Sequence, residues 1–66
     1  MALLFSFECM VLDTYDDVIF CVCHGQDGKI EFNEIWSHLF PDPSILVEGT
    51  CFMWQIYDEH NEYHLF

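Results

Sequence analysis

Hydrophobic and polar residues alternate along much of the chain, and this alternation predicts β-strands. Residues 3–12 and 51–58 carry apolar side chains at every second position, which is typical of strands with one buried face. Residues 18–24 are apolar on both faces and rich in β-branched side chains, as expected of a central strand. The alternating apolar positions are Leu3, Phe5, Phe7, Cys9 and Val11 in the first stretch, and Phe52, Trp54 and Ile56 in the last.

The segments between and after these stretches predict how the strands connect. Residues 25–28 contain two glycines, which take the positive φ angles of tight turns at little cost. Residues 29–32 are therefore expected to pair back antiparallel on residues 18–24. Residues 45–49 are either a further short strand or an extended lead-in to the next one, and residues 63–66 predict a closing strand.

A short α-helix is predicted between the hairpin and the prolines. Asn33 is a good N-cap, residues 34–40 follow it, and Pro41 ends the segment. Two apolar pairs have the i,i+4 spacing of a helix: Ile35 with Leu39, and Trp36 with Phe40. The sequence thus predicts one small acidic α+β domain spanning residues 1–66, an antiparallel sheet of four to five strands with one short α-helix packed on one face.

Charge narrows the class of partner. The chain has 12 acidic residues, Lys29 as its single basic side chain and a formal net charge of −11. Such a chain cannot neutralise phosphates, so we expect no direct contact with nucleic acid and no attraction to an anionic membrane. The same charge opposes compaction by self-repulsion, which suggests a cationic partner, bound metal ions or an unusual need for solubility.

One stretch, HGQDGKIEFNEIW, resembles the second half of a calcium-binding EF-hand loop. Asp27, Gly28 and Glu34 would fit that pattern, but the first and third ligand positions fall on Cys23 and Gly25, which offer no hard oxygen side chain. The four cysteines lack the paired spacing of structural zinc sites and are better explained as small buried hydrophobes. We therefore predict no metal, no cofactor, no catalytic residue and no enzymatic activity.

The opening residues do not predict export. The segment MALLFSFECMVLD lacks a positively charged n-region, contains Glu8 and shows no small-residue cleavage site. No apolar run approaches the length of a membrane helix, about 20 residues. We expect a cytoplasmic protein with reduced cysteines. The apolar surplus, 53% of residues, leaves a homodimer open.

The acidic residues are spread along the whole chain, mostly in predicted turns and on the polar sides of predicted strands. A compact domain would then carry carboxylates over much of its surface, spaced like the phosphates of a duplex, and would attract a channel lined with Lys and Arg. Three groups are predicted to bind this partner: Asp13, Asp16 and Asp17; Asp27, Glu31 and Glu34; and Asp58, Glu59 and Glu62.

In size, in its single basic residue and in its predicted pattern of a sheet with one helix, the chain resembles the small acidic inhibitors of phages and other mobile elements, in particular DNA-mimic anti-CRISPR proteins. The resemblance implies an inhibitor that occupies a basic DNA-binding surface of a bacterial interference complex and blocks target recognition inside the host cell. Two alternatives remain open. One is an inhibitor of another DNA-binding enzyme, such as a uracil-DNA glycosylase, and the other is an acidic interaction module or homodimeric, antitoxin-like regulatory subunit.

Overall fold

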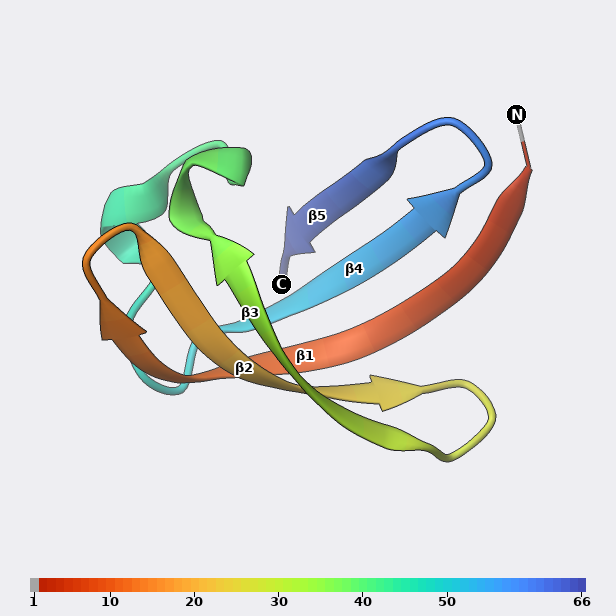
Figure 1. The fold of residues 1–66 in the computed structure, drawn as a ribbon, viewed down its shortest axis with the longest axis horizontal. Helices are drawn as coiled ribbons and strands as arrows, with labels where there is room; N and C mark the ends of the chain where they lie inside the picture. Colours follow the sequence, from red (N-terminus) through yellow and green to blue (C-terminus); the bar gives the residue numbers. More distant parts are fainter. Residues whose placement is uncertain (1) are drawn as a thin grey trace.

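Five antiparallel strands form one sheet in the computed structural model, which describes residues 2–66. The strand order is β3-β2-β1-β4-β5, so β1 lies at the centre and β3 and β5 form the edges (Figure 1). The strands are β1 (Leu3–Tyr15), β2 (Val18–Gly25), β3 (Ile30–Trp36), β4 (Cys51–Tyr57) and β5 (Asn61–Leu65).

Tight turns set the register of the first three strands. Asp16 takes a positive φ of 52° between β1 and β2, a conformation that Asp tolerates better than most residues. Between β2 and β3, Gly28 has φ 85°, and its N–H donates to the carbonyl of Gly25 at 3.1 Å. The sequence prediction of a glycine turn followed by an antiparallel strand is therefore confirmed, although β3 is longer than expected.

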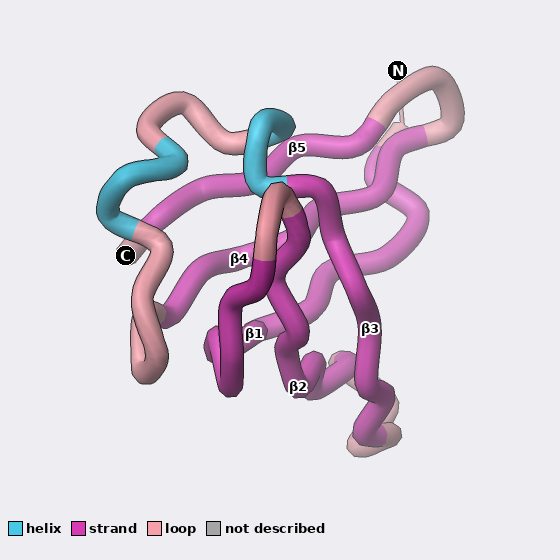
Figure 2. Tube along the Cα trace, turned by 60° about the vertical axis from the view of Figure 1, so that its left-hand side comes forward, coloured by secondary structure: helices cyan, strands magenta, loops and turns pink. Residues whose placement is uncertain are grey.

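The predicted α-helix does not form, so the α+β prediction is wrong and the fold is all-β. Residues 33–36 continue β3, and the connection to β4 contains only two 3₁₀ turns, η1 (Ser37–Leu39) and η2 (Pro43–Ile45), drawn in cyan in Figure 2. The reason is that β2 offers a pairing partner along this whole segment, up to Val18 opposite Trp36. A two-turn helix is marginal in water, whereas strand pairing satisfies the same backbone groups.

Of the two alternatives for residues 45–49, the short strand does not form, and the segment is a lead-in to the next strand. Its first residue ends η2, and the remainder is an irregular lead-in to β4 held by local bonds. The Thr50 hydroxyl donates to the Ile45 carbonyl at 3.1 Å and accepts from the Val47 N–H at 3.2 Å. Pro43 and Gly49 disfavour a regular strand here.

One face of the sheet, the inner face, carries the core, and the connection between β3 and β4 covers part of it. Phe40 and Leu46 from this connection are buried against the strands. Phe40 meets Phe52 edge-on at 5.0 Å between ring centroids and lies 4.9 Å from Tyr63. Burying one such aromatic side chain is worth about 1.5–3 kcal/mol. The remaining buried residues are Cys9, Val11, Ile19, Cys21, Cys23, Ile35 and Phe52.

The opposite face, the outer face, is largely exposed despite its apolar composition. On the edge strand β3, Phe32 is 62% exposed and Trp36 56% exposed. Phe20 of β2 stacks against Phe32 with ring centroids 6.0 Å apart. The alternation that buries one face of β2 and β3 therefore leaves a second apolar face open to solvent.

Two register shifts interrupt β1, one between Leu3 and Phe5 on the β4 side and one between Val11 and Asp13 on the β2 side. Bulges bend a strand and increase its twist. Figure 1 shows β1 as a long curved strand, and its bend carries the β2–β3 and β4–β5 turns away from each other.

Candidate acidic binding surface

The acidic side chains point outward. Within residues 2–66 every Asp and Glu is exposed except Glu62, which is half-buried. Lys29 is the only Lys or Arg, and its Nζ lies 4.0 Å from a carboxylate oxygen of Asp27, with both side chains well exposed. An exposed pair at that distance is worth little, so the surface remains strongly negative.

The spacing of this charge is comparable to that of a nucleic acid. The Cα trace measures 31 × 23 × 19 Å. A formal net charge of −11 over the longest dimension corresponds to roughly one charge per 3 Å, whereas a nucleic acid carries about one per 1.7 Å of duplex axis and one per 3.4 Å along each strand. A groove that holds DNA with lysines and arginines would meet a similar density of negative charge here.

The first predicted group lies together at the connection between β1 and β2. Asp16 and Asp17 form the connection itself, and Asp13 lies just before it. The Asp13 carboxylate accepts from the Thr14 N–H at 2.8 Å, while the Asp17 carbonyl accepts from the Ser37 N–H at 2.7 Å. These contacts fix the backbone of the turn while its carboxylates remain exposed.

The second predicted group is only partly brought together, because Asp27 and Glu31 line one cleft and Glu34 does not. Asp27 lies in the β2–β3 turn, whereas Glu31 and Glu34 lie on β3 on opposite faces, because residues an odd number apart alternate along a strand. The predicted helix placed Glu34 in its first turn, and this was wrong. On the outer face Glu34 accepts a hydrogen bond from the Tyr15 hydroxyl, which raises the pKa of Tyr15. Glu34 thus joins the first group.

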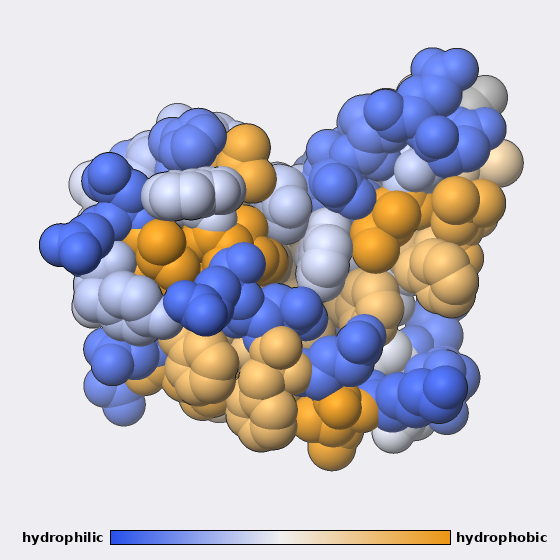
Figure 3. Space-filling model, in the orientation of Figure 1, coloured by the Kyte–Doolittle hydropathy of each residue, from blue (hydrophilic) through white to orange (hydrophobic). Residues whose placement is uncertain are grey.

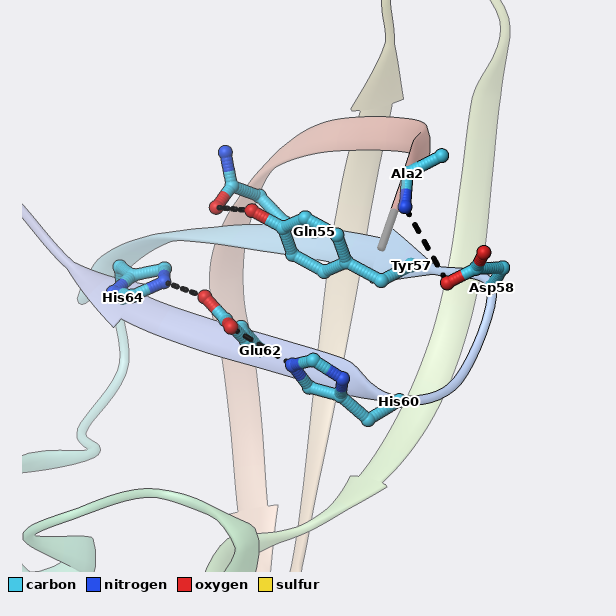
Figure 4. Close-up of polar contacts among 7 residues, drawn as sticks. All are labelled: Ala2, Gln55, Tyr57, Asp58, His60, Glu62 and His64. Atoms are coloured by element: carbon cyan, nitrogen blue, oxygen red, sulfur yellow. Dashed lines mark hydrogen bonds and ion pairs between the residues drawn. The ribbon is translucent and has the colours of Figure 1, made fainter.

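The third predicted group lies at the β4–β5 turn, where two histidines accompany its acidic residues (Figure 4). His60 Nε2 and His64 Nε2 each lie 2.8 Å from a different carboxylate oxygen of Glu62. These hydrogen bonds lower the pKa of Glu62. At the same turn Asp58 accepts from the Ala2 N–H at 3.4 Å, and Glu59 is exposed.

Sequence reasoning missed the role of the two histidines. The four-residue spacing of His60 and His64 has no meaning as a helical ligand pair here, because the segment is a turn followed by a strand. In extended chain residues two apart project to the same side, so Glu62 and His64 of β5 lie together with His60, which immediately precedes the strand. The period-2 spacing of His, Glu and His was the signal that would have predicted this cluster.

Three cysteines form a buried thiol cluster on the inner face. Cys9 is paired with Cys23 across the strands, and Cys21 Sγ lies 3.7 Å from Cys23 Sγ. Hydrogen bonding to Cys21 and Cys23, together with burial, raises the pKa of Cys9, and the bond to Cys23 raises the pKa of Cys21 to about 12. The neighbouring thiols of Cys21 and Cys9, together with the hydrogen bond donated by the Asn33 amide, lower the pKa of Cys23. With exposures of 3% or less, these side chains serve the core. Cys51 is the exposed cysteine.

Comparison of the chain with protein-family models, with curated proteins and with solved structures found no match. Within the part of the chain that the structure describes, no helix has the length and apolar character needed to cross a membrane. Across the same residues, no group of three or more His, Cys, Asp or Glu side chains is arranged to hold a metal ion. The acidic surface is therefore the candidate site on which a functional proposal rests.

Proposed function

We propose that the protein is an inhibitor that acts as a nucleic-acid mimic. Its target is a basic DNA-binding surface of a bacterial interference complex, as for a DNA-mimic anti-CRISPR protein in the host cytoplasm. The observation that carries the proposal is the outward display of the acidic side chains around a single exposed lysine. A chain with this surface competes with DNA for the same cationic side chains.

The physics of the surface explains how inhibition works. A net charge of −11 on a domain only 31 Å long steers it toward a cationic groove over a range set by the Debye length, about 8 Å at physiological salt. The groups at the β1–β2 connection and at the β4–β5 turn lie at opposite ends of the sheet, because β1 and β4 run antiparallel. Two ends of the inhibitor thus contact separate parts of a DNA channel.

The test is competition between the protein and a labelled target duplex for a purified interference complex, followed by fluorescence anisotropy. Wild-type protein is expected to displace the duplex and to bind more weakly as salt rises. Neutralising Asp13, Asp16 and Asp17 to Asn should weaken binding about tenfold, since three rim contacts are worth roughly 0.5 kcal/mol each.

A charge-matched control is available in the same chain. Glu8→Gln, Asp42→Asn and Glu48→Gln remove three charges outside the proposed groups and should weaken binding less. Charge reversal of all the grouped acids that leaves inhibition intact would show that the protein does not act by mimicry.

A second candidate, a homodimeric regulatory subunit, is favoured by the edge strand β3. Its outer-face residues Ile30, Phe32 and Trp36 are exposed and apolar. If two copies pair antiparallel along all of Ile30–Trp36, the pairing is centred on Asn33 of both copies. Phe32 of one copy then lies opposite Glu34 of the other, and Ile30 lies opposite Trp36. No carboxylate then lies directly opposite another.

Sedimentation velocity over a range of protein concentrations separates the two candidates. A dimer through β3 predicts a concentration-dependent mass that Phe32→Lys abolishes. Val47→Lys is the control, because Val47 is as exposed as Phe32 but lies in the connection outside the sheet. A monomer at all concentrations, or dissociation by both variants, would exclude the β3 dimer.

A further inference from the structure

A cleft of about 600 Å³ opens on the inner face where the connection between β3 and β4 does not cover the sheet. One wall is formed by the first half of β1 and the second half of β4, and the other by the β2–β3 hairpin. Figure 3 shows apolar surface between two hydrophilic lobes on its right-hand side, where Figure 1 places the β4–β5 and β2–β3 turns.

Aromatic rings form the floor. Phe5 and Phe7 are stacked with centroids 6.5 Å apart, and Phe7 lies 5.3 Å from Trp54. Phe7 is paired with Gly25 across the strands, and a Cβ at Gly25 would lie 3.2 Å from the Phe7 ring. A side chain at residue 25 would crowd the Phe7 ring, so the glycine leaves room for the ring beside the hairpin. Phe5 is 60% exposed, so the floor presents an aromatic face to an incoming group.

Carboxylates and amides form the rim on the hairpin side. Asp27 and Glu31 line the cleft together with Lys29, Gln26 and Asn33. Lys29 lies next to Asp27, whereas Glu31 makes no ion pair with any residue from 2 to 66. The cleft thus combines an aromatic floor with an unpaired carboxylate at its edge.

We infer that this cleft binds an arginine side chain of the protein's partner. The planar guanidinium stacks on aromatic faces and pairs with carboxylates, and its alkyl stem covers apolar surface. Phe5 and Phe7 provide the stacking surface, Ile56 the apolar wall and Glu31 the counter-charge. A DNA phosphate would be repelled, and an uncharged apolar group would leave Glu31 without a partner.

The composition of the chain shows that the arginine must come from another molecule. The sequence contains no arginine, and its one lysine already lines the cleft. A second copy of the chain therefore cannot supply the ligand. The inference rests on the proposed function, because the basic surface of a DNA-binding complex is where exposed arginines are concentrated, and it specifies one point of attachment.

The experiment is a ¹H–¹⁵N NMR titration of the intact chain with N-acetyl-arginine-N-methylamide at low salt. Shifts are expected at Gly25, at Glu31 and at the Trp54 indole. Glu31→Gln and Phe5→Ala should each weaken the affinity about threefold, in line with one exposed ion pair and one cation–π contact. Phe5 is exposed, so its removal should not prevent folding. Glu48→Gln, which lies outside the cleft lining and outside the three acidic groups, should leave the affinity unchanged.

Norleucine and lysine analogues of the same amide provide the chemical controls. The inference is overturned if the norleucine analogue produces the same shifts, if the lysine analogue binds as tightly as arginine, or if neither Glu31→Gln nor Phe5→Ala weakens binding. A cleft that binds arginine in a protein that fails to displace DNA would refute the proposed function alone. Displacement of DNA without arginine-induced shifts would refute the cleft alone.

Discussion

At the scale of single residues, Trp54 carries a polar group that the fold leaves unused. Its indole N–H is buried and has no hydrogen-bond acceptor among residues 2–66. A buried donor without a partner costs about 1–3 kcal/mol. The ring nevertheless stays in place because it packs between Phe7 and Tyr63, with centroids 5.3 Å and 6.1 Å away.

Replacing Trp54 separates these two effects. Trp54→Phe removes the unpaired donor and keeps an aromatic ring, so the free energy of unfolding should change by less than about 1 kcal/mol. Trp54→Ala removes the packing as well and should cost about 2 kcal/mol or more. Urea unfolding followed by circular dichroism measures both. Because both variants lack the donor, equal losses would show that ring packing does not hold this side chain in place.

Glu62 predicts a dependence of stability on pH. Its folded-state pKa lies below the usual value of 4.5 because His60 and His64 bond to the carboxylate. A lowered pKa stabilises the fold above the unfolded-state value, and this contribution is lost as the pH falls through the folded-state value. Glu62→Gln should therefore lose less stability than the wild type between pH 6 and pH 3.

Glu59→Gln is the control for this measurement, because neither histidine bonds to Glu59. Urea unfolding at several pH values should show a change in slope for Glu62→Gln and none of comparable size for Glu59→Gln. The same acid dependence in Glu62→Gln as in the wild type would contradict the role of the histidine contacts.

At the scale of elements, the sequence predicted which segments form strands better than it predicted where those strands end. The alternation in residues 3–12 and 51–58 and the apolar run at residues 18–24 correspond to β1, β4 and β2. These patterns are long enough for periodicity to be decisive. The ends of elements depend on their neighbours, so β1 extends to Tyr15 to match the start of β2.

The segment after Asn33 shows why local pattern was insufficient there. Ile35 is buried opposite Ile19, and Trp36 lies on the other face opposite Val18. The same apolar residues satisfy both the i,i+4 spacing of a helix and this alternation. Over eight residues the difference between helix and strand propensity is small, so pairing with a neighbouring strand determines which structure forms. That pairing is tertiary information, which one segment does not contain.

The β2–β3 turn provides a prediction for this element. Gly28 has φ 85°, and a Cβ built on it meets no atom within 4 Å, so a substitution there tests backbone strain without a steric clash. Gly28→Ala should lower stability by about 1 kcal/mol, and Gly28→Asn by less, because Asn tolerates positive φ. The corresponding loss in melting temperature for Ala is about 4–8 °C. Equal melting temperatures for all three proteins would contradict the turn conformation.

At the scale of the whole molecule, net charge should dominate the response to salt. With a formal charge of −11 and one exposed lysine, the folded domain is stabilised whenever repulsion is screened. Raising NaCl from about 0.02 M to about 0.5 M, where the Debye length falls to a few Å, should raise the melting temperature. A variant with Asp16, Asp17 and Asp58 changed to Asn should respond less. A flat or falling curve for the wild type would be inconsistent with self-repulsion.

Composition alone predicted that the carboxylates lie on the surface, because charged groups are seldom buried unpaired. The grouping of these acids could not be predicted where it depended on secondary structure, as for Glu31 and Glu34 on opposite faces of β3. The cleft could not be predicted from the sequence either. It depends on the bend of β1 and on the register that places Phe7 beside both Gly25 and Trp54.

The strand order also has a consequence for how the chain folds. The β1–β2–β3 meander closes through two short turns, and the β4–β5 hairpin closes through one, whereas the seam between β1 and β4 joins Leu3 to Tyr57. Short loops close at lower entropic cost, so the meander and the hairpin are expected to form first and the seam last. In stopped-flow experiments Ile19→Val should slow folding, and Phe52→Leu should mainly speed unfolding. The reverse assignment would place the folding nucleus at the seam.

Until the seam between β1 and β4 closes, Phe52 and Cys9 do not bury each other. The meander is therefore the species most prone to aggregate during synthesis.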